Sequence, residues 1–437
     1  MSQAWIFAAD MGYGHQRAAY PFRDIACERV FTANNDAIVR PEDRRQWEKL
    51  QGFYEGISRM SNLPVIGQPL WRAYDRLQAI HPHYPLRDLS KPSLGSARLQ
   101  KIIRRGFASS VVEHSRTRAD LPVLTTFFAI ALAADHAGRG DVFCVVTDTD
   151  VNRVWVAADP RKSRVMYLAP IPLTRLRLLQ YGVPDENIFV TGFPLPEESV
   201  ANAADDLRRR LPVLDPTGAF RRKYADILRA TLGAIPDRAE RPFTITFPVG
   251  GAGAQSGIAN DILGSLASDL REDRVRINLV AGVRAEVERR FREMIAGHGL
   301  DAEIGRAIRI QRAPTKDEYF AEFNALLRDT DVLWTKPSEL CFYGALGIPL
   351  VMCPALGAHE ERNASSLIRV GAAQPQEDPR AAGEWLRWWL RTGMLAMNAF
   401  NGWYHIPRHG TENIKRVLFA PKRADVELEM WPPAEKL

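Results

Sequence analysis

Cysteine is scarce in this sequence. Its 437 residues include four, Cys27, Cys144, Cys341 and Cys353, which lie far apart and form no C-x-x-C pair. That spacing is not typical of a disulfide framework or of a structural zinc site. Low-complexity tracts and repeats of solenoid period are absent as well. With 46% hydrophobic and 25% charged residues, the composition excludes a disordered, collagen-like or coiled-coil chain.

Long apolar runs are also missing. The longest uncharged apolar stretch, residues 121–134, is too short to span a bilayer. The first residues carry no basic segment of the kind that opens a signal peptide. We therefore expect a cytoplasmic protein whose only membrane contact is peripheral, at the inner face. The net charge of +6 is scattered along the chain, which disfavours nucleic acid as a partner and suits anionic lipid or a phosphorylated ligand.

Two α/β series follow one another along the chain, and the length exceeds a single core. Residues 1–204 form the first predicted domain, with an insertion of two amphipathic helices at about 41–80. An arginine-rich stretch at 205–240, with a helix near 220–232, is interpreted as a linker. Residues 241–437 form the second domain, whose last helix is expected to pack back on the first. The predicted strands are 4–9, 123–126, 142–147, 164–168 and 188–190, then 243–247, 277–280, 308–311, 332–334 and 350–353.

The first strand ends in a glycine loop, after which a helix is predicted over 16–29. The loop is not the dinucleotide fingerprint G-x-G-x-x-G, because Arg17 stands at the third glycine. Gly12 and Gly14 allow the backbone to approach a ligand closely. His15 opens the helix, where an imidazole can exchange a proton near neutral pH. From the residues alone, His15 is either such a base or a helix-capping or packing residue.

A second glycine loop follows the strand at 243–247 and precedes another helix. Gly250, Gly251 and Gly253, followed by Gln255, place successive backbone N–H groups at the helix start, an arrangement that binds anions. The loop lacks the Gly-Lys-Ser/Thr of a Walker A motif, so ATP hydrolysis is not supported. A plain tight turn is the alternative interpretation.

Two more strand ends in the second domain carry polar residues. Lys336, Ser338 and Glu339 follow the strand at 332–334, and the segment 357–363 follows the strand at 350–353. Ligands of α/β folds bind at the carboxyl ends of parallel strands. Three such loops therefore suggest a site for a phosphorylated, hydroxyl-rich ligand such as a nucleotide sugar. The last loop contributes His359, Glu360, Glu361 and Asn363.

In their order along the chain, these motifs resemble the GT-B glycosyltransferases, especially family 28. That family includes diacylglycerol galactosyl- and glucosyltransferases and the N-acetylglucosaminyltransferase that forms lipid II. The loop at 12–19 is similar to the family's acceptor loop, and Thr147-Asp148 to its Thr-Asp segment. Residues 181–194 are similar to the stretch that closes the N-terminal domain, and 250–253 to the diphosphate loop. The run from 335 to 373 is similar to the donor-binding core.

The resemblance implies two Rossmann-like domains facing across a cleft. It also implies an inverting, metal-independent transfer from a nucleotide-diphosphate sugar, with UDP the expected nucleotide, to a hydroxyl of a lipid or small molecule. The base would be His15 or Asp148, and no cofactor is needed because the nucleotide sugar is a substrate. The donor residues would be Gly250, Gly251, Gly253, Gln255, Lys336, Ser338, Glu339, His359, Glu360, Glu361 and Asn363.

The sequence departs from the family at one position. Where the family has a glutamate that holds the nucleotide ribose, this chain has Phe342, with Glu339 just upstream as a substitute. The departure indicates a divergent branch and leaves open a nucleotide-sugar 2-epimerase, or a non-catalytic nucleotide-sugar sensor or scaffold. Asp148-Thr149-Asp150 spells the metal-binding D-x-D pattern but lies in the acceptor domain, so we expect no metal. Aromatic and arginine residues alternate at 47–77 and 385–391. These segments either contact an anionic lipid surface or pack within their own domains.

Overall fold

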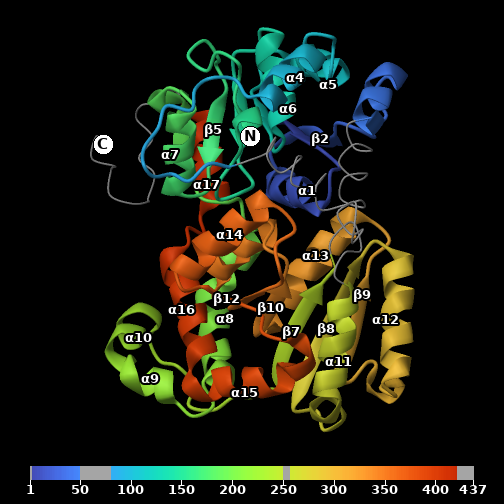
Figure 1. Ribbon diagram of the computed structural model, residues 1–437, viewed down its shortest axis with the longest axis vertical. Helices are drawn as coiled ribbons and strands as arrows, with labels where there is room; N and C mark the ends of the chain where they lie inside the picture. Colours follow the sequence, from blue (N-terminus) through green and yellow to red (C-terminus); the bar gives the residue numbers. More distant parts are fainter. Residues whose placement is uncertain (1, 50–79, 250–255, 421–437) are drawn as a thin grey trace. The chain divides into compact units, whose positions relative to one another are not determined.

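The computed structural model describes residues 2–49, 80–249 and 256–420 and contains two compact units, each with a parallel sheet and helices (Figure 1). Unit 1 comprises Met1–Leu195, Leu356–Arg362 and His409–Leu437. Unit 2 comprises Pro196–Ala355 and Asn363–Arg408. The predicted α/β class with two Rossmann-like domains is confirmed.

Unit 1 has six parallel strands in the order β2-β1-β3-β4-β5-β6. Strands β1, β3, β4 and β5 are buried along their full length, as expected of a parallel sheet with helices on both faces. The strands are β1 (Ala4–Ala8), β2 (Ala26–Thr32), β3 (Val123–Thr125), β4 (Val142–Val145), β5 (Met166–Ala169) and β6 (Ile188–Val190). The helices include α1 (Tyr13–Ala19), α4 (Leu94–Ile103), α5 (Ser109–Ser115), α6 (Phe128–His136), α7 (Pro172–Gln180) and α17 (Gly410–Phe419).

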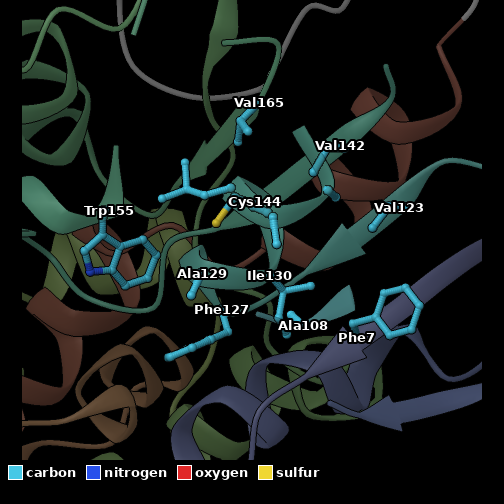
Figure 2. Close-up of a cluster of buried hydrophobic side chains, with 14 of the residues drawn as sticks. Phe7, Ala108, Val123, Phe127, Ala129, Ile130, Val142, Cys144, Trp155 and Val165 are labelled. Atoms are coloured by element: carbon cyan, nitrogen blue, oxygen red, sulfur yellow. The ribbon is translucent and has the colours of Figure 1, made fainter. Parts of the chain in front are cut away.

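The two faces of this sheet have separate cores, because side chains alternate along each strand. Phe7 of β1 packs on one face with side chains of β3, β4 and α6, including Val123 and Ile130, as Figure 2 shows. Ile6 of β1 packs on the other face against Val417 of α17. The helix near the end of the described chain therefore completes the core of unit 1.

Unit 2 is a second doubly wound sheet, in the order β12-β11-β10-β7-β8-β9. Its chain starts at β7 in the middle, proceeds outward to β9, and returns to β10 on the other side. The strands are β7 (Phe243–Pro248), β8 (Val275–Gly282), β9 (Ile308–Arg312), β10 (Val332–Thr335), β11 (Leu350–Met352) and β12 (Ala373–Pro375). The helices include α8 (Glu197–Leu214), α9 (Ala219–Lys223), α10 (Ala225–Leu232), α11 (Ser256–Arg271), α12 (Ala285–Gly297), α13 (Lys316–Leu326), α14 (Ala358–Arg369), α15 (Ala382–Thr392) and α16 (Met394–His405).

The helix predicted over 16–29 is shorter in the structure. It ends at Ala19, a 3-10 turn η1 (Tyr20–Phe22) follows, and the chain then enters β2. Pro21 has no N–H to continue the helical hydrogen bonds. Exposed Glu28 and Arg29 on this edge strand conceal the alternation that marks a strand with one buried face.

Residues 205–240, expected as a linker with a helix near 220–232, group with unit 2, and most of them lie in α8, α9 and α10. In α8, buried Ala203, Leu207 and Leu211 recur every fourth residue, which is the spacing of a packed helix face. The arginines that suggested a linker include exposed ones along the same helices. Of the insertion expected at about 41–80, residues 41–49 are helical and 50–79 lie outside the described residues.

Candidate functional site

The strand order creates a topological switch point in each sheet. In unit 1 the chain leaves β1 toward β2 on one side and later enters β3 on the other. In unit 2 the same reversal occurs at β7 and β10. Open α/β sheets bind ligands beyond the carboxyl ends of the two strands at such a point. The loops that carry His15 and Lys336 follow β1 and β10, so the predicted residues stand at these two positions.

Gly12 and His15 follow β1 in unit 1. Gly12 has φ +105°, a backbone conformation that glycine adopts without the steric cost of a Cβ, and it precedes α1 directly. Gly14 lies within α1, and His15 is half-buried in its first turn. The glycine at position 12 is therefore required by the sharp entry into the helix.

His15 is fixed to the end of β3 by two reciprocal hydrogen bonds. Its ring Nδ1 lies 2.6 Å from the Thr126 carbonyl oxygen, and Thr126 Oγ1 donates to the His15 carbonyl at 2.8 Å. The imidazole edge also meets the Phe127 ring, with centroids 5.0 Å apart. A carbonyl oxygen only accepts, so Nδ1 carries the hydrogen and the lone pair of the neutral ring is on Nε2. This tautomer is the one that a general base acting through Nε2 requires.

The two carboxylates of the D-x-D pattern lie in different environments after β4. Asp148 is half-buried, whereas Asp150 is buried and 1% exposed. Asp150 accepts two hydrogen bonds from Arg177, at 2.7 and 2.9 Å, and its Oδ2 lies 3.1 Å from His83 Nε2. Burial alone would raise the pKa of Asp150, but the bonds to His83 and Arg177 outweigh it and lower that pKa. Asp150 is thus paired with cationic and imidazole groups rather than presented as a metal ligand.

This buried pair also holds the segment that precedes α4. Arg177 donates to the His81 carbonyl and, at 3.0 Å, to Gln180 Oε1. Gln180 in turn donates to the His83 carbonyl at 2.9 Å. Neither His83 nor Arg177 is predicted as a site residue from the sequence, since an arginine within an amphipathic helix carries no sign that it is buried. Together they brace the loop that contains Asp148.

In unit 2 the predicted donor loop follows β7. Gly250, Gly251, Gly253 and Gln255 lie outside the described residues. The end of β10 is described, and there Lys336, Ser338 and Glu339 are half-buried. Ser338 N–H donates to the Lys336 carbonyl at 2.8 Å. This tight turn gathers the three predicted side chains at the switch point.

Asn363 supports the same turn from α14. Its side chain is buried, and Nδ2 donates to the Pro337 carbonyl at 3.2 Å. The structure therefore gives Asn363 a role in holding the loop after β10. Arg210 of α8 supports the far end of the following 3-10 helix, η7 (Glu339–Leu346), by donating to the Leu346 carbonyl at 3.2 Å. Burial lowers the pKa of Arg210 to about 10.

Phe342 is a core residue of η7, with 1% of its surface exposed. A 3-10 helix has three residues per turn, so side chains at i and i+3 lie one above the other. Glu339 therefore projects from the same edge of η7 as Phe342, one turn nearer to β10.

The remaining predicted residues stand at the start of α14. Glu360 is buried, and its Oε2 accepts from the Leu356 N–H at 2.8 Å, which caps the helix. His359 and Glu361 are exposed, and residues 356–362 group with unit 1. Within that unit, Arg362 donates to the Ile80 carbonyl at 2.9 Å. The boundary between the two units thus falls within α14, and Asn363 of the same helix belongs to unit 2.

Residues 2–49, 80–249 and 256–420 contain neither a metal-binding cluster nor a membrane-spanning helix. Within these ranges, no group of three His, Cys, Asp or Glu side chains could hold a metal ion. No helix in this described part combines the length and the apolar character needed to cross a bilayer.

Comparison with known proteins adds a fold class. Residues 306–391 match a family described as "Domain of unknown function (DUF6938)". No curated protein sequence is similar to the chain. Among solved structures, MurG of Acinetobacter baumannii has a TM-score of 0.51 at 15% identity, covering 96% of this chain and 99% of that one. UDP-GlcNAc 2-epimerase of Neisseria meningitidis, a structure bound to UDP-GlcNAc, has a TM-score of 0.50 at 11% identity with the same coverage.

These likenesses extend over almost the whole chain and both sheets. The protein therefore has the two-domain GT-B α/β fold, which is the fold predicted from the order of its motifs. Its neighbours include both a MurG and an epimerase. At this level of identity they define the fold and not the reaction, and membership of family 28 stays a prediction.

Proposed function

We propose that this chain is a glycosyltransferase that binds a nucleotide-diphosphate sugar, with UDP as the nucleotide, and transfers the sugar to a hydroxyl acceptor with inversion. The observation that carries the proposal is the tautomer of His15, whose Nδ1 bond to the Thr126 carbonyl assigns the lone pair to Nε2. The fold supports the choice of ligand, since a structure of this fold is bound to UDP-GlcNAc.

Unit 2 would hold the donor in this proposal. The backbone N–H groups of Gly250, Gly251 and Gly253 would face the diphosphate, with the start of α11 behind them. Lys336 would add a positive charge, and Glu339 would take the ribose hydroxyls from its edge of η7. Each preorganised donor to the departing diphosphate is worth about 10²–10³ in rate.

Unit 1 would supply the base. The proton of the acceptor hydroxyl passes to His15 Nε2 while the acceptor oxygen forms its bond to the anomeric carbon. The bond from that carbon to the diphosphate oxygen breaks, and its electron pair leaves on the nucleotide diphosphate. Asp148 is the second candidate for the base, since it follows β4 on the same sheet. No metal or cofactor takes part in the proposed step.

The reaction class is tested by incubating the protein with nucleotide sugars and a panel of lipid and soluble acceptors. Release of free nucleotide that depends on the acceptor supports transfer. Conversion of the sugar to its C2 epimer without an acceptor would identify an epimerase instead. Tight binding with neither product would identify a sensor or scaffold, a role that Phe342 at the ribose position favours.

The donor loop is tested by Gly251→Val, which introduces a branched side chain where backbone approach to the diphosphate is required. We expect calorimetric binding of UDP to be abolished. Gly297→Val in α12 of the same unit is the matched control, because a Cβ there meets nothing within 4 Å. Equal UDP affinity in the Gly251 variant and wild type would contradict the diphosphate assignment.

A further inference from the structure

A pocket in unit 2 lies outside the residues assigned to the proposed function. It has a volume of about 650 Å³ and is formed by the turn before α9, by α9 and α10, and by the segment after α10. That volume is within the range of pockets that hold small organic ligands. Arg221, Arg222 and Arg229 line it, so its polar surface is strongly cationic.

The three guanidinium groups are engaged to different degrees. Arg221 is part of the framework, since it donates to Asp215 Oδ2 at 3.3 Å and to the Pro236 carbonyl at 2.8 Å. Arg222 is exposed and donates to the Thr217 carbonyl at 2.7 Å. Arg229 is exposed, and its side chain has no hydrogen bond or ion pair with any residue that the structure describes. Two of the three cations therefore have donors to offer to an anion.

The local charge balance is positive. The segment from 216 to 237 contains four cations and two carboxylates, and a third carboxylate, Asp215, is already bonded to Arg221. An anionic ligand would thus meet little opposing charge. The four cations are Arg221, Arg222, Lys223 and Arg229, and the two carboxylates are Asp226 and Asp237.

One exposed aromatic side chain lies beside this pocket, and another lies on a helix that packs against α9. Tyr224, between α9 and α10, is 37% exposed, and its ring lies 5.0 Å from Phe220. Phe220 contacts Phe400, which stacks on Tyr404 at 5.6 Å, and Tyr404 is 52% exposed. Phe220 and Phe400 are buried, so these ring contacts join α9 to α16 through the core, and the two helices lie beside each other in Figure 1. Aromatic rings with one wet edge favour the membrane–water interface.

Helix α15 adds a tryptophan next to the same pocket. Thr217 Oγ1, at the pocket edge, donates to the Arg391 carbonyl at 2.9 Å, and Trp388 lies one turn earlier with 63% of its surface exposed. The other tryptophans of this helix pack inward, with Trp385 5.1 Å from Trp334 and Trp389 6% exposed. Of the three tryptophans in the aromatic and arginine pattern at 385–391, two therefore pack inside the unit and one lies on its surface.

We propose that the exposed side chains of this region, Arg222, Tyr224, Arg229 and Trp388, bind the surface of an anionic phospholipid bilayer. A lipid phosphate enters the arginine pocket, and the exposed rings insert at the headgroup level. Cations together with exposed aromatic rings favour a lipid over a soluble phosphate as the ligand. A soluble phosphate would bind the cations but would gain nothing from the aromatic side chains. The proposal does not depend on the reaction that the protein catalyses.

The test is flotation of the full chain, without nucleotide, with mixed phosphatidylcholine–phosphatidylglycerol vesicles and with pure phosphatidylcholine vesicles at low salt. We expect binding to the anionic vesicles only, weakened by added salt. The double variant Arg222→Gln/Arg229→Gln should lower the partition coefficient about thirtyfold, since each cation near an anionic surface contributes about fivefold. Arg289→Gln/Arg290→Gln on α12 is the control with the same charge change and exposed positions, and should bind like wild type.

Trp388→Ala separates the aromatic contribution from charge. It should weaken vesicle binding several-fold, while its melting temperature and its UDP affinity stay at the wild-type values because Trp388 is exposed. Binding of inorganic phosphate in the pocket without vesicle binding would overturn the lipid assignment. Equal loss in the α12 control would mean that only net charge matters. A dimer by sedimentation that the Arg222/Arg229 variant dissociates would assign the face to a second copy instead.

Discussion

Asp150 provides the sharpest test of the structure of unit 1. The change is Asp150→Asn, which keeps the shape of the side chain and removes its charge. The carboxylate is 1% exposed, and the guanidinium of Arg177, which bonds to it at 2.7 and 2.9 Å, is completely buried. Neutralising Asp150 leaves that cation uncompensated in a place where water cannot solvate it. Breaking a buried pair in this way costs about 3–5 kcal/mol.

The matched control is Asp185→Asn in the same unit. Asp185 makes a pair of the same bidentate form with Arg175, at 2.9 and 2.6 Å, but its side chain is 57% exposed. Exposed pairs contribute about 0–1 kcal/mol. In urea or thermal unfolding followed by the near-ultraviolet signal, Asp150→Asn should therefore lower the melting temperature by at least about 6 °C, and Asp185→Asn by at most a few degrees.

The pH dependence of the stability loss in Asp150→Asn is a second test of the buried pair. The pKa of Asp150 is lowered in the folded protein, so its contribution to the free energy of unfolding is fully present above the unfolded value of about 4. It is lost as the pH falls through the folded pKa. The stability difference between wild type and Asp150→Asn should thus be constant near neutral pH and shrink below about pH 4. Equal effects of the Asp150 and Asp185 variants, or a difference that grows in acid, would refute the buried pair.

Further predictions concern the site and its support. His15→Asn keeps a hydrogen-bond donor near the Nδ1 position for the Thr126 carbonyl but removes the Nε2 base, so kcat should fall about 10²–10⁴-fold while UDP affinity stays unchanged. Wild-type turnover would exclude His15 as the base. The control is His136→Asn, at an exposed histidine of the same unit. Gly402→Ala should lower the free energy of unfolding by about 1–3 kcal/mol, and the melting temperature with it, because its Cβ would clash with the Gly344 carbonyl oxygen. An unchanged melting curve would contradict this packing. Turnover should be the same with EDTA and with added Mg²⁺ or Mn²⁺, and activity that needs a metal would contradict the metal-independent step.

The sequence predicted the fold class well because buried parallel strands leave a strong local pattern. Every strand expected in the second half overlaps an observed one, and the fully apolar run of β1 marks a strand with both faces covered. The edge strand β2 was missed because Glu28 and Arg29 are exposed there. The end of α8 was assigned to a linker because its arginines, Arg209 among them exposed, concealed its apolar stripe. In both cases, exposed polar side chains obscured the apolar periodicity of the element. The sequence alone does not show which side chains are exposed.

The candidate site divides in the same way. Residues that follow a strand end, such as Gly12, His15 and Lys336, could be located from sequence, because chain order alone places strand ends in a parallel sheet. The chemical states of these residues could not be predicted from the sequence. Which nitrogen of His15 carries the hydrogen depends on Thr126, more than a hundred residues away in the chain. That Asp150 is paired rather than available depends equally on Arg177.

The succession of buried apolar strands and intervening helices was enough by itself to predict a two-sheet α/β protein, and the two glycine loops predicted where a ligand would bind. These are local properties of the chain, fixed by backbone sterics and side-chain polarity. Only the tertiary structure decided that Glu360 caps a helix, that Trp388 is exposed while Trp389 is buried, and that arginines from the expected linker line one pocket. Such properties depend on which residues distant in sequence become neighbours, and therefore on the packing of the whole unit.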